Sequence, residues 1–206
     1  FNSSSYRMIA EPYCFRSQAD LITKPISRTP RNNPDVIRAK LGIGTKECLA
    51  ILTMGGIAED YKSIQPMKEA TGFTFLIPGG KDQVEKDDNI LFLPHASDFY
   101  HPDLIYASDI VIGKIGYSTL AEVYQAGKPF GYIPREGFRE SEKLTGYISE
   151  HMNGCKIDGQ SYQDGSWVNH LEDLKQLPSI DRKSPTGAEQ AAEFILSLLS
   201  NQVTRS

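Results

Sequence analysis

Cysteine is scarce in this sequence, and its apolar runs are short. Cys14, Cys48 and Cys155 are odd in number and far apart, with no Cys-x-x-Cys spacing. This pattern argues against a disulfide framework and a zinc site and predicts reduced thiols. No apolar run approaches the roughly 20 residues that cross a bilayer, and no secretory signal pattern opens the chain. We therefore expect a cytoplasmic protein without a membrane span.

An excess of positive charge is also missing. The 206 residues contain 22 Lys and Arg against 26 Asp and Glu, a net charge of −4. Domains that bind duplex nucleic acid usually carry a basic excess, so nucleic acid is not an expected partner. The 39% of hydrophobic and 23% of charged residues are ordinary for a globular domain.

Several catalytic motifs are absent. The chain has no Gly-x-Ser-x-Gly elbow, no Walker loop and no His-Glu-x-x-His motif, which argues against the enzyme classes that use them. No carboxylate cluster has metal-ligand spacing, and there is no Asp-x-Asp pair. We expect no metal and no cofactor. His101, His151 and His170 are scattered, and we interpret each as a surface residue.

From Cys48 onward, continuous apolar runs of strand length alternate with helix-like segments. Such strands predict a parallel sheet covered on both faces, an α/β doubly wound, Rossmann-like domain. The expected strands are 48–54, 73–77, 90–93, 110–113, 130–133 and 154–157. The expected helices are 35–41, 60–70, 101–107, 118–125, 139–150, 167–174 and 186–199. The last helix has one apolar stripe, which we expect to cover the core. Residues 19–23 are a further candidate strand ahead of a Pro-rich linker.

Ligands of open parallel sheets bind beyond the carboxyl ends of the strands. There, the strand that ends near Gly113 leads into Lys114 and Gly116, and a helix opens at about Ser118. Gly116 permits a tight turn and a close approach of a ligand to the backbone. The N–H groups at Ser118 and Thr119 form an anion site, to which Lys114 adds charge.

Glu122, one helical turn further on, can accept hydrogen bonds from sugar hydroxyls. Together these groups suit a ribose diphosphate. The alternative is an ordinary packing turn, in which Thr119 is the N-cap and Glu122 completes a capping box.

The stretch 108–134 closely resembles the donor-binding signature of glycosyltransferase family 28, which lies in the C-terminal half of the two-domain GT-B fold. The matching elements are Ser108-Asp109, Lys114, Gly116, Thr119-Leu120, Glu122, Ala126-Gly127-Lys128-Pro129 and Ile133-Pro134. The resemblance implies that residues 116–119 cradle the nucleotide diphosphate and that Glu122 takes the ribose hydroxyls. It further implies that Gly55-Gly56 lie near the donor phosphates and that the segment around His95 pairs with the uracil edge.

The loop 135–142 departs from that signature. In the peptidoglycan lipid II N-acetylglucosaminyltransferase of the family, a Gln pair reads the donor sugar here, whereas this loop is acidic and lacks Gln. The variant is similar to a lesser-known branch of predicted glycosyltransferases and to the GT-B-like half of plant arabinokinases. We expect Arg139, Glu140, Ser141 and Glu142 to face the sugar. Alternatively, the acids only complement the dipole of the following helix.

The resemblance implies the donor-binding half of a metal-independent glycosyltransferase, inactive alone, with a UDP-sugar as its donor. Residues 1–34 are then the tail of a missing N-terminal GT-B domain plus a linker, and 35–206 the nucleotide-sugar-binding domain. The catalytic residues are unknown, and any peripheral membrane contact would run through the missing half. The alternatives are a non-catalytic nucleotide-sugar-binding or regulatory module, and a nucleotide-sugar hydrolase or epimerase on the same scaffold.

Overall fold

A seven-stranded sheet forms the centre of the molecule. The computed structural model describes residues 4–14, 18–54, 64–135 and 137–203. Neighbouring strands are parallel except for one antiparallel edge strand, β5. The order is β5 (Glu85–Asp87), β6 (Ile90–Pro94), β4 (Phe73–Lys81), β3 (Cys48–Thr53), β7 (Ile110–Lys114), β8 (Phe130–Ile133) and β9 (Gly154–Lys156). The predicted parallel sheet is thus confirmed.

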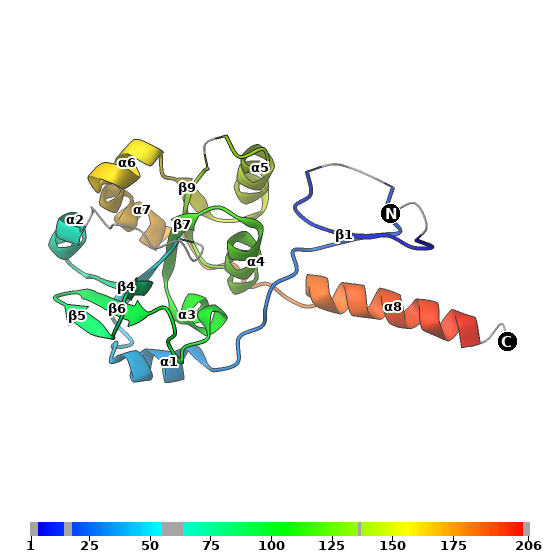
Figure 1. Cartoon of the computed structure of the whole chain (residues 1–206), viewed down its shortest axis with the longest axis horizontal. Coiled ribbons are helices and arrows are strands. Elements are labelled where there is room, and N and C mark those ends of the chain that lie inside the picture. The colour runs from blue at the N-terminus through cyan, green and yellow to red at the C-terminus, as the bar shows by residue number, and fades with distance from the viewer. Residues whose placement is uncertain (1–3, 15–17, 55–63, 136, 204–206) are drawn as a thin grey trace.

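Helices cover both faces of the sheet, because the strands are apolar on both sides. One face packs on α1 (Pro34–Leu41), α3 (His101–Ala107), α4 (Tyr117–Ala126) and α5 (Ser141–His151). The other packs on α2 (Ile64–Glu69), the 3-10 turn η1 (Ser166–His170) and α7 (Leu171–Gln176), with α6 (Gly159–Asp164) beside them. Figure 1 shows these two layers of helices with the sheet between them.

Three polar segments differ from the sequence analysis. β4 continues to Lys81, beyond its expected end at residue 77. β5 lies between β4 and β6, where no element was expected. β5 consists of Glu85, Lys86 and Asp87, a charged edge strand without an apolar signal. The helix expected at 167–174 is divided between η1 and α7, and α6 precedes it.

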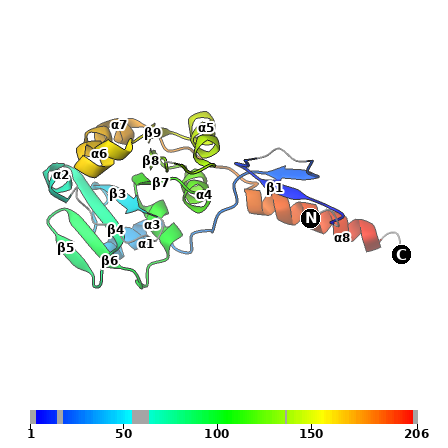
Figure 2. The same cartoon turned by 45° about the horizontal axis from the view of Figure 1, so that its top comes forward.

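The prediction that the last helix covers the core is wrong. In α8 (Gly187–Val203), the side chains of Ile195, Leu196 and Leu199 are 44%, 62% and 54% exposed. The helix extends away from the sheet and lies beside a second, two-stranded parallel sheet, β1 (Met8–Ala10) with β2 (Leu21–Thr23) (Figures 1 and 2). The Lys24 backbone N–H donates to Gln190 Oε1 at 2.8 Å, and the rings of Tyr6 and Phe194 meet edge to face.

Candidate functional site

The chain reverses its direction of winding between β3 and β7. From β3 it moves outward through β4 and β6, then returns to β7 on the other side and continues to β8 and β9. Thr53 pairs with Gly113 at the carboxyl ends of β3 and β7, and Lys114 pairs with Ile133 of β8. Open α/β sheets bind ligands at such a point. The loops beyond these four residues therefore define the candidate site.

α4 begins directly after β7 and leaves open space beside its first residues. Among the described residues, a Cβ atom placed on Gly116 would meet no atom within 4 Å apart from its chain neighbours and its own helix. Gly116 has a φ of −154°, which any residue adopts, so the turn itself does not require glycine. The open space matches the close backbone approach predicted for a ligand, whereas the tight-turn explanation is wrong.

The capping-box alternative is also wrong. The N-cap of α4 is Gly116, and no side chain caps the helix. Thr119 is a buried residue of the first turn, Ser118 is exposed, and the carboxylate of Glu122 points to other partners. The first N–H groups of an α-helix have no acceptor within the helix, so they are available to an anion.

Two cations stand at the ends of β7 and β8. Partial burial, together with the charge of Arg135, lowers the pKa of Lys114, so the two side chains feel each other's charge. Among the described residues, the Nε atom of Arg135 is buried without a hydrogen-bond partner. Two like charges in proximity are stabilised by an anion between them. Sequence analysis named Lys114 but not Arg135 as a site residue.

Glu122 anchors a network that joins three parts of the chain. Its Oε1 accepts from Arg28 Nε at 2.7 Å, and its Oε2 accepts from His101 Nδ1 at 3.0 Å. The other ring nitrogen of His101, Nε2, lies 3.2 Å from the hydroxyl oxygen of Thr53. The Glu122 side chain is 3% exposed, whereas that of His101 is 30% exposed. His101 is therefore not isolated, as its scattered position in the sequence indicated, but belongs to a hydrogen-bonded network while its ring stays partly exposed.

The linker before α1 is fastened to the start of α3. The buried Asp103 accepts hydrogen bonds from the backbone N–H of Arg31 at 2.5 Å and of Asn32 at 3.2 Å. The guanidinium groups of Arg28 and Arg31 lie over the ring of Tyr100. These contacts hold Arg28 in place beside Glu122.

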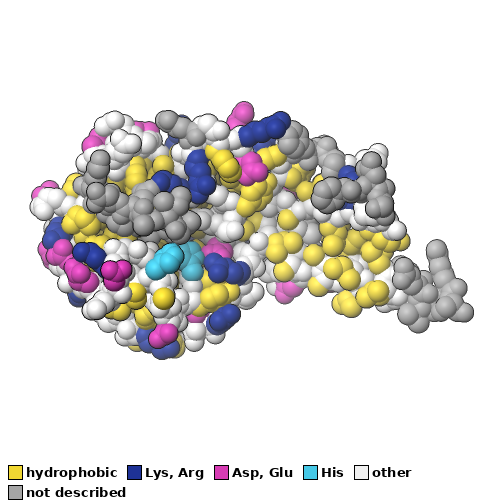
Figure 3. All heavy atoms as spheres, in the orientation of Figure 1, with side chains coloured by type: hydrophobic (Ala, Val, Ile, Leu, Met, Phe, Trp, Pro, Cys, Tyr) yellow, Lys and Arg dark blue, Asp and Glu magenta, His cyan; other side chains and the backbone are white. Residues whose placement is uncertain are grey.

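A hollow of about 610 Å³ opens at the carboxyl ends of β3, β4 and β6. Its walls include apolar side chains, among them Met54, Pro78 and Phe99, and the polar residues Thr53, His95 and His101. Figure 3 shows histidine side chains gathered on this face next to acidic and basic ones. Its size and its mixed walls suit a flat, polar-edged ring such as a nucleobase.

The loop before α5 lies on the same edge. Ser141 Oγ donates to the carbonyl oxygen of Arg135 at 2.9 Å, which ties the loop to the helix. Burial, a contact with Cys14 and the charge of Glu140 raise the pKa of Tyr117 to about 12, which places Glu140 near the start of α4. Glu142 is an exposed acid in the first turn of α5, and Arg139 is exposed. Both the sugar and the helix-dipole interpretations of these acids stay predictions.

Two of the expected nucleotide-binding residues, Gly55 and Gly56, are outside the residues that the structure describes. Within the described ranges, no three His, Cys, Asp or Glu side chains are grouped so that they could hold a metal ion. None of the helices in the described part of the chain combines the length and apolarity that a membrane crossing requires.

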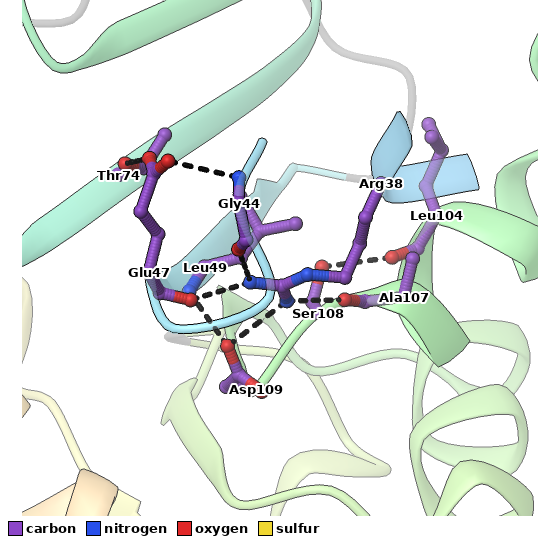
Figure 4. A network of polar contacts seen from close by, with 9 residues as sticks. All are labelled: Arg38, Gly44, Glu47, Leu49, Thr74, Leu104, Ala107, Ser108 and Asp109. Carbon is purple, nitrogen blue, oxygen red and sulfur yellow. Dashed lines mark hydrogen bonds and ion pairs between the residues drawn. The ribbon is translucent and has the colours of Figure 1, made fainter. Parts of the chain in front are cut away.

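The beginning of the resembling stretch is structural (Figure 4). Arg38 of α1 is buried and donates to the carbonyl oxygens of Ala107, Gly44 and Glu47 and to the carboxylate of Asp109. The same Asp109 oxygen accepts from the Leu49 N–H at 2.8 Å, and Ser108 Oγ donates to the Leu104 carbonyl. These bonds join α1, α3, β3 and β7 at the end of the sheet opposite the candidate site.

Gly127 in the middle of the stretch is structural as well. It ends α4 with a φ of +64°, and a Cβ atom there would lie 1.8 Å from the carbonyl oxygen of Ile180. The parts of the stretch that lie at the candidate site are therefore Lys114 to Glu122 and the end of β8 at Ile133.

The comparisons with known proteins agree with this geometry. No protein-family model matches the chain. The chain is 29% identical over 177 residues to an L-arabinokinase of Arabidopsis thaliana, a match that covers 85% of this chain and 17% of the arabinokinase.

Three solved structures share the fold. The spinosyn forosaminyltransferase SpnP matches 94% of this chain with a TM-score of 0.61 and 15% identity. Arabidopsis thaliana UGT89C1 complexed with UDP matches 87% with a TM-score of 0.55 and 10% identity. The spinosyn rhamnosyltransferase SpnG complexed with thymidine diphosphate matches 88% with a TM-score of 0.55 and 15% identity.

This chain spans 54%, 52% and 53% of the lengths of those three structures, about half of each. They are GT-B glycosyltransferases, and the match covers one Rossmann-like unit with the strand order described above. The chain has the fold of the Rossmann-like half of a GT-B glycosyltransferase.

Proposed function

We propose that the chain is the donor-binding half of a metal-independent glycosyltransferase and that it binds a nucleoside diphosphate sugar, with UDP as the nucleotide. The observation that carries the proposal is the edge of the sheet beyond β7, where Lys114 and Arg135 are close enough to feel each other's charge and the described residues leave Gly116 uncovered. Two positive charges beside a helix amino end supply the field that a divalent cation would otherwise provide to a diphosphate.

The remaining parts of the edge fit the rest of such a ligand. The hollow beside His95 receives the base, and Glu122 belongs to the ribose end of the site. Glu140, Ser141, Glu142 and Arg139 are the groups that we assign to the donor sugar. UDP and thymidine diphosphate in the two similar structures support a nucleoside diphosphate as the ligand class.

The catalytic partner in this proposal is an N-terminal GT-B domain. Large apolar side chains are exposed along α8, where Ile195, Leu196 and Leu199 are 44%, 62% and 54% exposed, and Figure 3 shows a broad yellow area over the end of the molecule that contains α8. Contiguous apolar surface of this kind marks an interaction site. We assign it to the partner domain, and we place the protein in the cytoplasm on its three unpaired thiols.

The match to the arabinokinase favours a second candidate. It covers only 17% of a protein named for another activity. On that basis the same site would serve a non-catalytic module that binds a nucleotide sugar. Sugar transfer by the chain together with its partner domain separates the two candidates, since the module would bind the donor without transferring the sugar.

Calorimetric titration of the chain with UDP tests the shared claim. We expect binding that is equally tight in EDTA and in Mg²⁺. Gly116→Leu fills the open space without strain in the backbone, so UDP affinity falls by about tenfold or more while the melting temperature is kept. Gly159→Leu, at the open start of α6, is the matched control and leaves the affinity unchanged. Binding that needs the metal, or equal affinity for Gly116→Leu and the wild type, would contradict the proposal.

A further inference from the structure

The Glu122 carboxylate contacts two side chains from distant parts of the chain. Arg28 Nε donates to Oε1 at 2.7 Å, and His101 Nδ1 donates to Oε2 at 3.0 Å. Each carboxylate oxygen has a second lone pair, so these two bonds alone would leave Glu122 able to accept another. The side chain of Glu122 is nevertheless only 3% exposed. A ligand hydroxyl therefore reaches this carboxylate only when a neighbouring side chain moves.

Arg28 is the neighbour that moves at the lower cost. Its side chain is 54% exposed, and it belongs to the linker between β2 and α1 rather than to a helix or a strand. The His101 side chain is 30% exposed, stands at the first position of α3 and contacts Glu122 and Thr53 through its two ring nitrogens. Water can solvate a displaced guanidinium group, whereas a displaced His101 would lose both of its partners.

The linker keeps Arg28 beside Glu122. The backbone N–H of Arg31 donates to the buried carboxylate of Asp103 at 2.5 Å, which fastens the linker to α3. The Arg28 guanidinium itself lies over the ring of Tyr100, 5.4 Å from its centre. A tethered group has a high effective concentration at a partner within its reach, whatever the concentration of the protein. Arg28 is thus positioned to return to Glu122 whenever the carboxylate is free.

We propose that Arg28 is an intramolecular inhibitor of the nucleotide site, which occupies Glu122 until the ribose of a nucleoside diphosphate displaces it. Only the fraction of molecules in which Arg28 has left Glu122 is then competent to bind, so the pair lowers the apparent affinity by that fraction. The linker follows β2, so a movement of β2 relative to the large sheet would act on the site through Arg28. The inference rests on the proposed function, since it needs a nucleoside diphosphate with its ribose at Glu122.

Calorimetric titration of the full chain with UDP tests this inhibition. We expect Arg28→Ala to bind UDP about three- to tenfold tighter than the wild type, because every molecule is then competent. Arg28→Gln, which removes the charge but keeps a polar side chain, should also bind more tightly. Lys40→Ala, at an exposed position of α1, removes a charge of the same sign and is the matched control with wild-type affinity. The gain should be absent for 2′,3′-dideoxy-UDP, which has no ribose hydroxyl for Glu122.

Three results would overturn the inference. Equal UDP affinity of Arg28→Ala and the wild type would show that the ion pair does not compete with the ligand. Weaker binding by Arg28→Ala would show that Arg28 contacts the nucleotide, and an equal gain for the dideoxy nucleotide would show that Arg28 acts elsewhere than at the ribose. Failure of both the wild type and Arg28→Ala to bind UDP is a different result, which would refute the proposed function and this inference with it.

Discussion

Glu122 is a buried carboxylate whose charge is kept by its neighbours. Burial alone would raise its pKa, but the hydrogen bonds and charges of His101 and Arg28 together lower the pKa below the ordinary value of 4.5. A carboxyl group with a depressed pKa in the folded state contributes stability above its unfolded pKa. That stability is lost as the pH falls through the folded value.

Replacing this carboxylate therefore has a pH-dependent cost. We expect Glu122→Gln to lower the free energy of unfolding by about 1–3 kcal/mol near neutral pH, and by less at an acidic pH well below 4.5, because the wild-type carboxylate takes up a proton as the pH falls through its lowered pKa. Urea denaturation at both pH values measures the difference. Glu172→Gln, an exposed acid on α7, is the control. An equal destabilisation at both pH values would show that the charge of Glu122 contributes nothing.

Residues of the site differ in how visible they are in the sequence. Lys114, Gly116 and Glu122 follow one strand within nine positions, so their order alone predicts a common site. Arg28 and His101 lie 94 and 21 positions from Glu122, and Thr53 lies 48 positions from His101. No local pattern links them, because only the parallel pairing of β3 with β7 and the path of the linker bring them together. The one sign in the sequence was that His101 directly follows the loop after the β6 strand, at the carboxyl edge of the sheet.

At the scale of elements, the continuous apolar strands were predictable and the polar ones were not. β3, β4, β6, β7 and β8 are buried on both faces and read as apolar runs. β5 lies at the edge of the sheet and is charged throughout. The helix α8 shows the opposite error, since its apolar stripe is real but lies outside the core of the sheet.

Arg38 joins more elements than any other side chain in Figure 4. We expect Arg38→Leu to destabilise the chain by about 2–4 kcal/mol, chiefly because three carbonyl groups lose their donor, while the half-exposed Asp109 is solvated by water. Guanidinium denaturation measures this loss, and UDP affinity of the folded variant stays unchanged because the network lies at the opposite end of the sheet.

Lys40→Leu on the same helix is the matched control, since Lys40 is exposed. It should change the free energy of unfolding by less than about 0.5 kcal/mol. An Arg38→Leu variant as stable as this control would contradict the structural assignment of Asp109. A variant that is stable but binds UDP weakly would move Asp109 into the site.

At the scale of the whole molecule, the chain has two parts of unlike character. The seven-stranded sheet has its own core on both faces, whereas β1, β2 and α8 leave large apolar side chains exposed. Exposed apolar surface is unfavourable in water, and a contiguous patch of it commonly marks an interaction site. The proposed partner domain would cover it.

The exposed face predicts self-association of the chain when it is studied alone. We expect Leu196→Glu with Leu199→Glu to reduce the sedimentation coefficient measured at high concentration, because two of the most exposed apolar side chains become charged. The melting temperature should be unchanged, since neither side chain contributes to the core. A wild type that sediments as a monomer at every concentration, or a double variant that unfolds at lower temperature, would contradict this assignment of the α8 face.

A crystal structure of the chain soaked with UDP tests the central claim most directly. The account predicts a diphosphate beside Gly116 at the amino end of α4, between Lys114 and Arg135, a ribose at the Glu122 end of the site and a base in the hollow next to His95. No metal ion would be bound to the diphosphate, even when Mg²⁺ is present. Density for UDP at another place on the molecule, or a fully occupied site in which a cation bridges the phosphates to the protein, would contradict it.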